Sequence, residues 1–311
     1  MKLARYLLPA TLLLVCSATY GAAKSSHQLI EDAYQAGEFG SEQRLIYLVE
    51  SVRAQEALPQ EFRSEVKEIE KSATEIFFEV KSEWDRLSRE TQALLLPLLA
   101  RPSATHTYDS PSGMFKIHYN ITGTDAVSTT DVNPNNGIPD YIDWLADYAD
   151  SAYRAEVTNL GHLAPPGDFS SGGDSRYDVY TEDMPYYGYT QPEGAGDRAW
   201  NDYYSYISLE NNFSGFPAND DPDGDQKGAM KVTMAHEYYH AIQLGYEVNM
   251  GSDVWFMEIS STWMEEWVFP FTNDNYNYFS DWFNYPYYSL HSTSGLHPYG
   301  AFVWAKYLEE R

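Results

Sequence analysis

The segment from residue 229 to residue 244 constrains the fold of this 311-residue chain more than any other part. It contains no glycine or proline, Gly245 follows it, and it carries His236, Glu237 and His240 in the pattern HExxH. Residues four apart in an α-helix are separated by only about 40° around the axis, so both imidazole rings can bind one metal ion. Glu237 lies about 100° from His236, near enough to a metal-bound water to take its proton. We therefore expect a zinc-binding helix; the alternative is two structural histidines without a metal.

A zinc site needs a third protein ligand, and the sequence limits the choice. One common pattern continues HExxH with a glycine and a third histidine, but Gln243 and Tyr246 stand at those positions. The next helical segment instead offers Glu258, Thr262 and Glu265 on one face. We favour Glu258 as the ligand because it is nearest to the start of that segment. Glu265 would then orient a ligating histidine through its free ring nitrogen, or it would face solvent.

The first 23 residues have the order of an export signal. Lys2 and Arg5 precede an apolar run at 7–18, and small residues follow at 21–23. This run is too short to span a bilayer, so we expect a cleaved signal peptide and no membrane span in the mature chain. The mature protein would be secreted, periplasmic or at the cell surface. A lipoprotein anchored at Cys16 is the less favoured alternative, because Val15 suits a lipidation site poorly.

The charge balance argues against one class of partner. The chain has 20 Lys and Arg residues and 46 Asp and Glu residues, which gives a formal net charge of −26. Phosphate backbones are bound by clustered Lys and Arg, so we expect no nucleic acid partner. Aromatic residues make up 16% of the chain, and such large amphipathic rings suit a cleft for a peptide or protein substrate.

Helical periodicity dominates residues 24–104. In its second half, apolar residues recur at steps of three or four and form one stripe: Val66, Ile69, Ala73, Ile76, Val80 and Trp84. An earlier helix carries a second apolar set: Leu45, Leu48, Val49 and Val52. We expect this region to be either a scaffold for the rest of the chain or a pro-segment that covers an active site.

The pattern changes at about residue 105. Alternating apolar residues predict strands at 114–121, 177–180 and 204–209, and residues 139–160 predict a helix between the first two. Strands interspersed with helices predict an α+β domain over residues 105–311. The final segment, 299–311, reads as an apolar helix without a stop signal, so we expect the protein to continue beyond it.

The two helical segments that carry the candidate zinc ligands resemble those of the gluzincin clan of zinc metallopeptidases, the thermolysin-like enzymes and related metalloaminopeptidases. The matching residues are HExxH at 236–240 and the pattern WxxExxSTWME at 255–265. Residues 105–311 are also similar to an uncharacterised group of exported bacterial proteins regarded as metalloproteases, at 115–119, 137–141, 177–180 and 219–225.

The resemblance implies a zincin-like domain with a small sheet, in which His236, His240 and Glu258 bind zinc and Glu237 is the catalytic base. The glycine-rich signature of the aminopeptidases is missing upstream of the zinc helix. The interval between His240 and Glu258 is also one residue shorter than in those enzymes. Both departures favour an endopeptidase over an aminopeptidase.

Two loops rich in carboxylates and amides are candidate calcium sites, because calcium prefers such oxygen ligands. The first contains Asp131, Asn133, Asn135, Asp140 and Asp143, and the second contains Asp220, Asp221, Asp223 and Asp225. Bound calcium would relieve the repulsion among these carboxylates. The alternatives are a helix N-terminal turn capped by aspartates for the first loop and a solvated loop for the second.

These observations predict an exported zinc-dependent endopeptidase, in which Glu237 takes a proton from the activated water and passes it to the leaving amine. The developing oxyanion needs a further donor, and His297 and Tyr299 are the candidates. A non-catalytic, metal-stabilised surface binding module is the alternative, but such a module has no chemical need for Glu237. A glycoside hydrolase using paired carboxylates such as Asp221 and Glu265 would leave the HExxH spacing unexplained.

Overall fold

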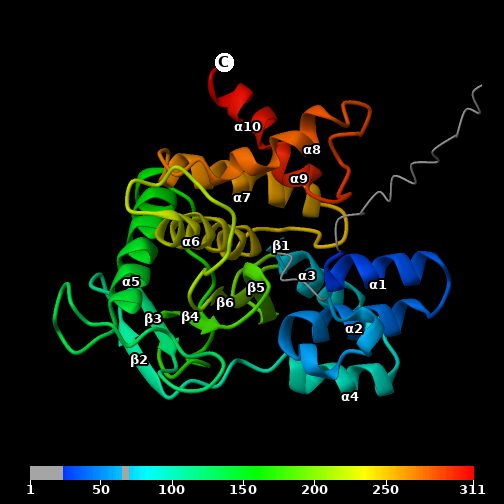
Figure 1. The fold of residues 1–311 in the computed structure, drawn as a ribbon, viewed down its shortest axis with the longest axis horizontal. Coiled ribbons are helices and arrows are strands. Elements are labelled where there is room, and N and C mark those ends of the chain that lie inside the picture. Colours follow the sequence, from blue (N-terminus) through cyan, green and yellow to red (C-terminus); the bar gives the residue numbers. More distant parts are fainter. Residues whose placement is uncertain (1–23, 65–69) are drawn as a thin grey trace, which may run out of the picture.

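A single mixed sheet with helices on both faces organises the chain (Figure 1). The computed structural model describes residues 24–64 and 70–311. The predicted signal peptide, residues 1–23, lies outside the described residues, as do Val66 and Ile69 of the apolar stripe. The combination of helices with a six-stranded sheet confirms the predicted α+β class.

The sheet has the strand order β1–β5–β6–β4–β3–β2. Its strands are β1 (Glu70–Ser72), β2 (His106–Asp109), β3 (Phe115–Tyr119), β4 (Tyr177–Glu182), β5 (Tyr186–Ala195) and β6 (Tyr203–Glu210). The central strands β3, β4 and β6 run parallel, and they correspond to the three predicted strands. β2 pairs antiparallel with β3, β5 pairs antiparallel with β6, and β1 adds a short parallel edge to β5.

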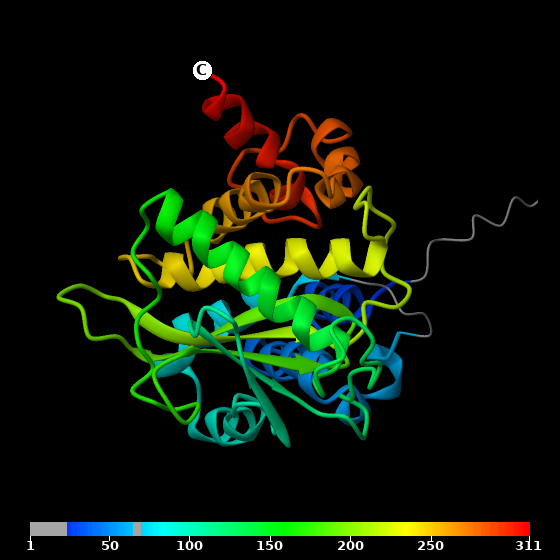
Figure 2. The same cartoon turned by 90° about the vertical axis from the view of Figure 1, so that its left-hand side faces the viewer.

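Both faces of the sheet are buried, because successive residues of its strands enter different apolar cores. Val179 and Ile207 pack with α5 (Asp140–Tyr153) and α6 (Asp225–Leu244). Their neighbours Tyr180 and Tyr206 point to the other face and pack with the N-terminal helices. Figure 2 shows α5 and α6 on one side of the sheet and the N-terminal helices on the other.

The N-terminal helices and α5 complete these two layers. The N-terminal helices are α1 (Ser26–Gln35), α2 (Ser41–Arg53), α3 (Thr74–Glu83) and α4 (Arg89–Leu98), with short turns η1 (Gln55–Ala57), η2 (Gln60–Phe62) and η3 (Trp84–Arg86). The predicted helix at 139–160 is confirmed as α5 and the π-helical turn η4 (Arg154–Asn159). None of the described helices is long and apolar enough to cross a membrane.

The C-terminal part forms a third layer beyond α6 (Figure 1). α7 (Val254–Val268) lies against α6, and α9 (His297–Gly300) and α10 (Phe302–Glu309) contact α7 from the outside. The turn η5 (Asp274–Tyr278) and α8 (Phe279–Phe283) lie beside α9. The predicted single helix at 299–311 is therefore wrong in detail, because the chain turns at Ala301 between α9 and α10.

The prediction of a continuous helix through the apolar stripe is also wrong. Residues 70–72 are the strand β1, and α3 begins only at Thr74. The backbone amide of Glu70 donates to Pro185, and that of Ala73 donates to Gly188. Backbone groups at the edge of β5 thus obtain partners, and this pairing outweighs the local helical periodicity.

Candidate metal centre

α6 carries the HExxH segment and is buried between the sheet and α7. It ends at Leu244, as predicted, but begins four residues earlier than predicted, at Asp225. Gly188 of β5 lets this helix approach the sheet closely. A side-chain methyl at position 188 would lie 2.8 Å from both the Thr233 methyl carbon and the Ser208 carbonyl oxygen. The absence of a side chain at position 188 therefore allows α6 to pack closely against the sheet.

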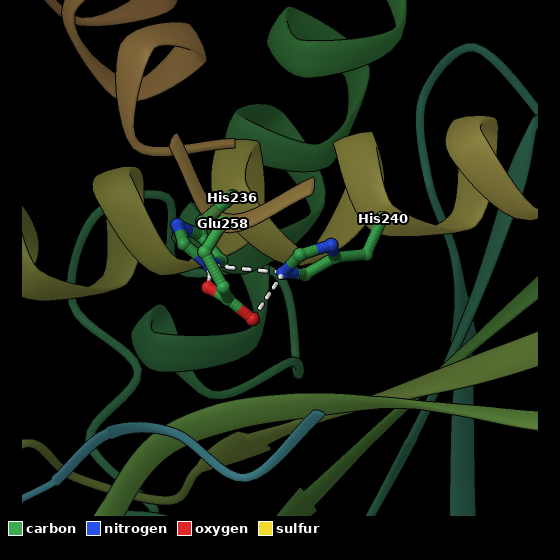
Figure 3. Close-up of side chains that lie close together, drawn as sticks. All are labelled: His236, His240 and Glu258. Carbon is green, nitrogen blue, oxygen red and sulfur yellow. Dashed lines mark hydrogen bonds and ion pairs between the residues drawn. The ribbon is translucent and has the colours of Figure 1, made fainter. Parts of the chain in front are cut away.

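His236, His240 and Glu258 come together between α6 and α7 (Figure 3). The Nε2 atoms of the two histidines are 3.1 Å apart. The Glu258 carboxylate lies 3.1 Å from His236 Nε2 and 3.3 Å from His240 Nε2. All three side chains are completely buried. The structure thus brings together the two predicted histidines and the favoured third ligand.

Hydrogen bonds on the far side of each ring fix which nitrogen can bind a metal. His236 Nδ1 lies 2.7 Å from Glu265 Oε1, and His240 Nδ1 lies 2.8 Å from Gln243 Oε1. The Gln243 amide is oriented because its nitrogen donates to the Met257 carbonyl and to Ser260. Carboxylate and amide oxygens only accept, so both Nδ1 atoms are the donors.

When a ring is neutral, the lone pair of its Nε2 therefore points toward the other ring and toward Glu258. Three acceptors within 4.8 Å of one another, in a site without solvent, require a cation or a shared proton between them. Two imidazole nitrogens and one carboxylate are a usual protein ligand set for zinc. The donor set thus fits the predicted metal.

Without a metal, the same contacts shift the pKa values of the ligands. Burial lowers the pKa of His236, but the hydrogen bonds with Glu258 and Glu265 outweigh burial and raise it to about 10. Burial raises the pKa of Glu258, but the two histidines outweigh burial and lower it to about 2. A proton on His236 can thus take the place that a metal would occupy.

Glu265 belongs to a buried charge network. One of its carboxylate oxygens bonds to His236, and the other lies 3.0 Å from the ammonium group of Lys71. Lys71 is 2% exposed and also pairs with Asp274 at 2.8 Å. Burial lowers the pKa of Lys71, but Asp274 and Glu265 outweigh it and raise the pKa, so the lysine stays charged. Glu265 is therefore fixed in position rather than solvated.

Glu237, the predicted base, points toward the sheet side of α6. Its carboxylate accepts hydrogen bonds from the hydroxyl groups of Ser72, Thr74 and Thr190. Glu237 is 1% exposed. Neither Ser72 nor Thr74 was expected in the site, because both lie far from the HExxH segment in the sequence and belong to no recognisable motif.

The two candidate oxyanion donors lie in different surroundings. The Tyr299 ring is 6.0 Å from the His236 ring. Burial and four nearby carboxylates, Glu258 first among them, raise the Tyr299 pKa well above its ordinary value, so its hydroxyl stays protonated. The His297 ring instead lies between Trp282 and Tyr288, and both of its buried nitrogens lack a hydrogen-bond partner among the described residues. Tyr299 is the better placed of the two.

The first candidate calcium loop uses its carboxylates to hold its own backbone. Asp131 accepts from the amides of Asn136 and Gly137, and Asp140 accepts from those of Val132 and Asn133. Asp140 and Asp143 lie in the first turn of α5. These contacts hold the loop before α5, and the N-terminus of α5 itself has no side-chain cap, so the alternative of aspartate caps is wrong.

In the second loop, a lysine supplies the positive charge that calcium was expected to supply. Lys231 lies 2.8 Å from both Asp221 and Asp223. Asp220 accepts from Asn273, and Asp225 accepts from the backbone amide of Asn219.

In the part of the chain that the structure describes, the His236–His240–Glu258 group alone brings three His, Cys, Asp or Glu ligand atoms within 4.8 Å. Calcium binding at either loop stays a prediction.

No family model matches the chain, and neither a curated protein nor a solved structure is significantly similar to it. The resemblance to gluzincins therefore depends on the sequence motifs alone.

Proposed function

We propose that this chain is an exported, zincin-like metallopeptidase that hydrolyses peptide bonds within proteins. His236, His240 and Glu258 would hold zinc, which supplies an acidified water and polarises the scissile carbonyl. Glu237 would take a proton from the water whose oxygen adds to the scissile carbonyl, and would deliver that proton to the amine as the C–N bond breaks. Tyr299 keeps its hydroxyl proton and is the donor for the developing oxyanion.

One observation carries this proposal. Three lone-pair acceptors meet in a dry site, and a carboxylate that is not among them lies on the next residue of the same helix. A site that only binds a metal needs the three ligands. Glu237 adds the base that hydrolysis requires.

A second function is favoured by the burial of the centre. His236, His240 and Glu258 are each 0% exposed, whereas catalytic zinc sites keep one position open to water or substrate. A non-catalytic, metal-stabilised binding module would have such a closed site. For a peptidase, elements that cover the centre must move before a peptide can reach Glu237.

Metal analysis combined with a digestion assay separates these functions. The chain from residue 24 is stripped of metal, reloaded with zinc, and tested on casein and a mixed peptide library with and without a chelator. The peptidase proposal expects about one zinc per chain and chelator-sensitive cleavage. His240→Ala should abolish both, whereas His106→Ala, a change at an exposed histidine outside the centre, should abolish neither.

The remaining outcomes are equally distinct. Stoichiometric zinc without cleavage of any substrate would support the binding module and contradict the peptidase. A chain that binds no zinc would contradict both functions.

A further inference from the structure

We propose that Ser72 and Thr74 are positioning residues for Glu237, which makes the N-terminal region a permanent part of the active site. This inference rests on the peptidase proposal, because it assigns the two hydroxyl groups a task in that reaction. It also separates the two expectations for residues 24–104, a scaffold or a removable pro-segment.

The two hydroxyl groups hold both oxygens of the Glu237 carboxylate. Ser72 Oγ lies 2.9 Å from Oε1, and Thr74 Oγ1 lies 2.7 Å from Oε2. Thr190 Oγ1 adds a contact of 2.9 Å to Oε2. Each carboxylate oxygen has two lone pairs. Thr190 has a single hydroxyl proton, and its Oγ1 also lies 2.7 Å from the backbone carbonyl oxygen of Glu237, so Thr190 is a shared donor. Thr74 is therefore the principal donor to Oε2 and Ser72 the donor to Oε1, and the carboxylate keeps lone-pair capacity to take a proton from the attacking water.

The direction of these hydrogen bonds is fixed by the backbone. The amide of Thr74 donates to Ser72 Oγ at 3.1 Å, and the amide of Thr190 donates to Thr74 Oγ1 at 2.8 Å. Each hydroxyl oxygen therefore accepts from an N–H group and is left to donate its own proton to Glu237. Charge-assisted hydrogen bonds of this kind restrict the rotation of the carboxylate.

The same short segment also holds the metal-ligand side of the site. Lys71, next to Ser72, pairs with Glu265, and Glu265 bonds to His236 Nδ1. Removal of the segment would leave Glu265 and Asp274 as buried carboxylates without their cation, which is strongly unfavourable. A pro-segment that must leave to allow activity would have to break this network.

The packing around residues 70–83 points in the same direction. β1 pairs with β5, and α3 places Ile76, Phe77 and Val80 in the core that also contains Tyr189 and Tyr206 of the sheet. Residues 70–83 therefore share a buried core with the sheet.

The test compares Thr74→Val with Thr74→Ser in the zinc-loaded chain. Valine keeps the shape of threonine and removes the hydroxyl, whereas serine keeps the hydroxyl. Thr91→Val is the matched control. Thr91 lies in α4, and its hydroxyl group also donates to a carboxylate, that of Glu42, which is not part of the metal centre. For each variant, zinc content, melting temperature, kcat and KM are measured, with wild-type cleavage shown to be chelator-sensitive.

We expect Thr74→Val to bind zinc fully and to lose about ten- to a hundredfold in kcat, with KM within about threefold of wild type. Thr74→Ser should recover most of that loss, and Thr91→Val should leave kcat unchanged. Ser72→Ala should behave like Thr74→Val.

Three results would overturn the inference while the peptidase proposal stands. The first is a kcat of Thr74→Val equal to that of the wild type. The second is a kcat of Thr74→Val above that of the wild type, as expected for an inhibitory segment. The third is a loss of kcat in Thr74→Ser as large as the loss in Thr74→Val. A zinc-loaded wild-type chain without cleavage is a different failure, because it overturns the peptidase proposal itself and the inference with it.

Discussion

Each histidine of the centre is held in one tautomer by a partner on its far side. Glu265 does this for His236, and Gln243 does it for His240. As a result, a cation between the Nε2 atoms is favourable, and in its absence a proton on His236 takes the same place. This proton is stabilised by Glu258 and Glu265, which raise the pKa of His236 to about 10 despite its burial. Proton and metal therefore compete for one site.

This competition predicts the pH dependence of metal binding. Below about pH 10 the metal-free site carries one proton that zinc must displace. The apparent zinc affinity should therefore rise about tenfold per pH unit between roughly pH 6 and pH 8, with the release of about one proton per zinc. Isothermal titration calorimetry in two buffers of different ionisation enthalpy measures this number. Zinc binding without proton release near neutral pH would contradict the assigned protonation.

At the scale of elements, local patterns predicted the helices that carry the ligands. The spacing of His236 and His240 and the face shared by Glu258 and Glu265 are properties of single helices, so the sequence displays them. The contacts of Ser72 with Glu237 depend on the pairing of β1 with β5, and Ser72 lies opposite Gly188, more than a hundred positions away. No periodicity within residues 66–84 shows that partner. For this reason, the strand and its hydroxyl groups were missed.

The close approach of α6 to β5 predicts a specific packing defect. Gly188→Ala would place a methyl group 2.8 Å from the Ser208 carbonyl oxygen and from the Thr233 side chain. A shift of α6 would relieve the contact with Thr233, but the carbonyl is sheet backbone, so β5 or β6 must also distort. We expect a loss of about 1–3 kcal/mol in the free energy of unfolding. Gly167→Ala is the control, since the space around that position is open. Denaturant unfolding checks both; equal stabilities would contradict the assigned contact.

At the scale of the whole molecule, the sheet shares its two faces between the N-terminal and C-terminal parts of the chain. One core joins α5 and α6 to the sheet, and the other joins α1–α4 to the opposite face. The tyrosines of that second core, among them Tyr186, Tyr189 and Tyr206, are buried only because the N-terminal helices cover them. The change of pattern near residue 105 therefore marks a change of secondary structure, and the apolar core extends across it.

This shared core predicts the behaviour of a shortened chain. A chain that begins at residue 105 would expose the tyrosine face of the sheet and lose β1, so we expect it to aggregate or to lack a cooperative unfolding transition. The chain from residue 24 should unfold in one transition. Calorimetry of the two chains makes the comparison. A cooperative transition in the shorter chain, with a melting temperature near that of the longer one, would show that the second core is dispensable.

The most direct measurement of the central claim is the rate of peptide cleavage by the zinc-loaded Glu237→Gln variant. Glutamine has nearly the shape of glutamate, so Ser72, Thr74 and the three zinc ligands should keep their places. It cannot accept a proton at neutral pH. We predict the zinc content of the wild type and a loss of about a hundred- to ten-thousandfold in kcat. A variant that binds zinc fully and cleaves peptides at the wild-type rate would contradict the account.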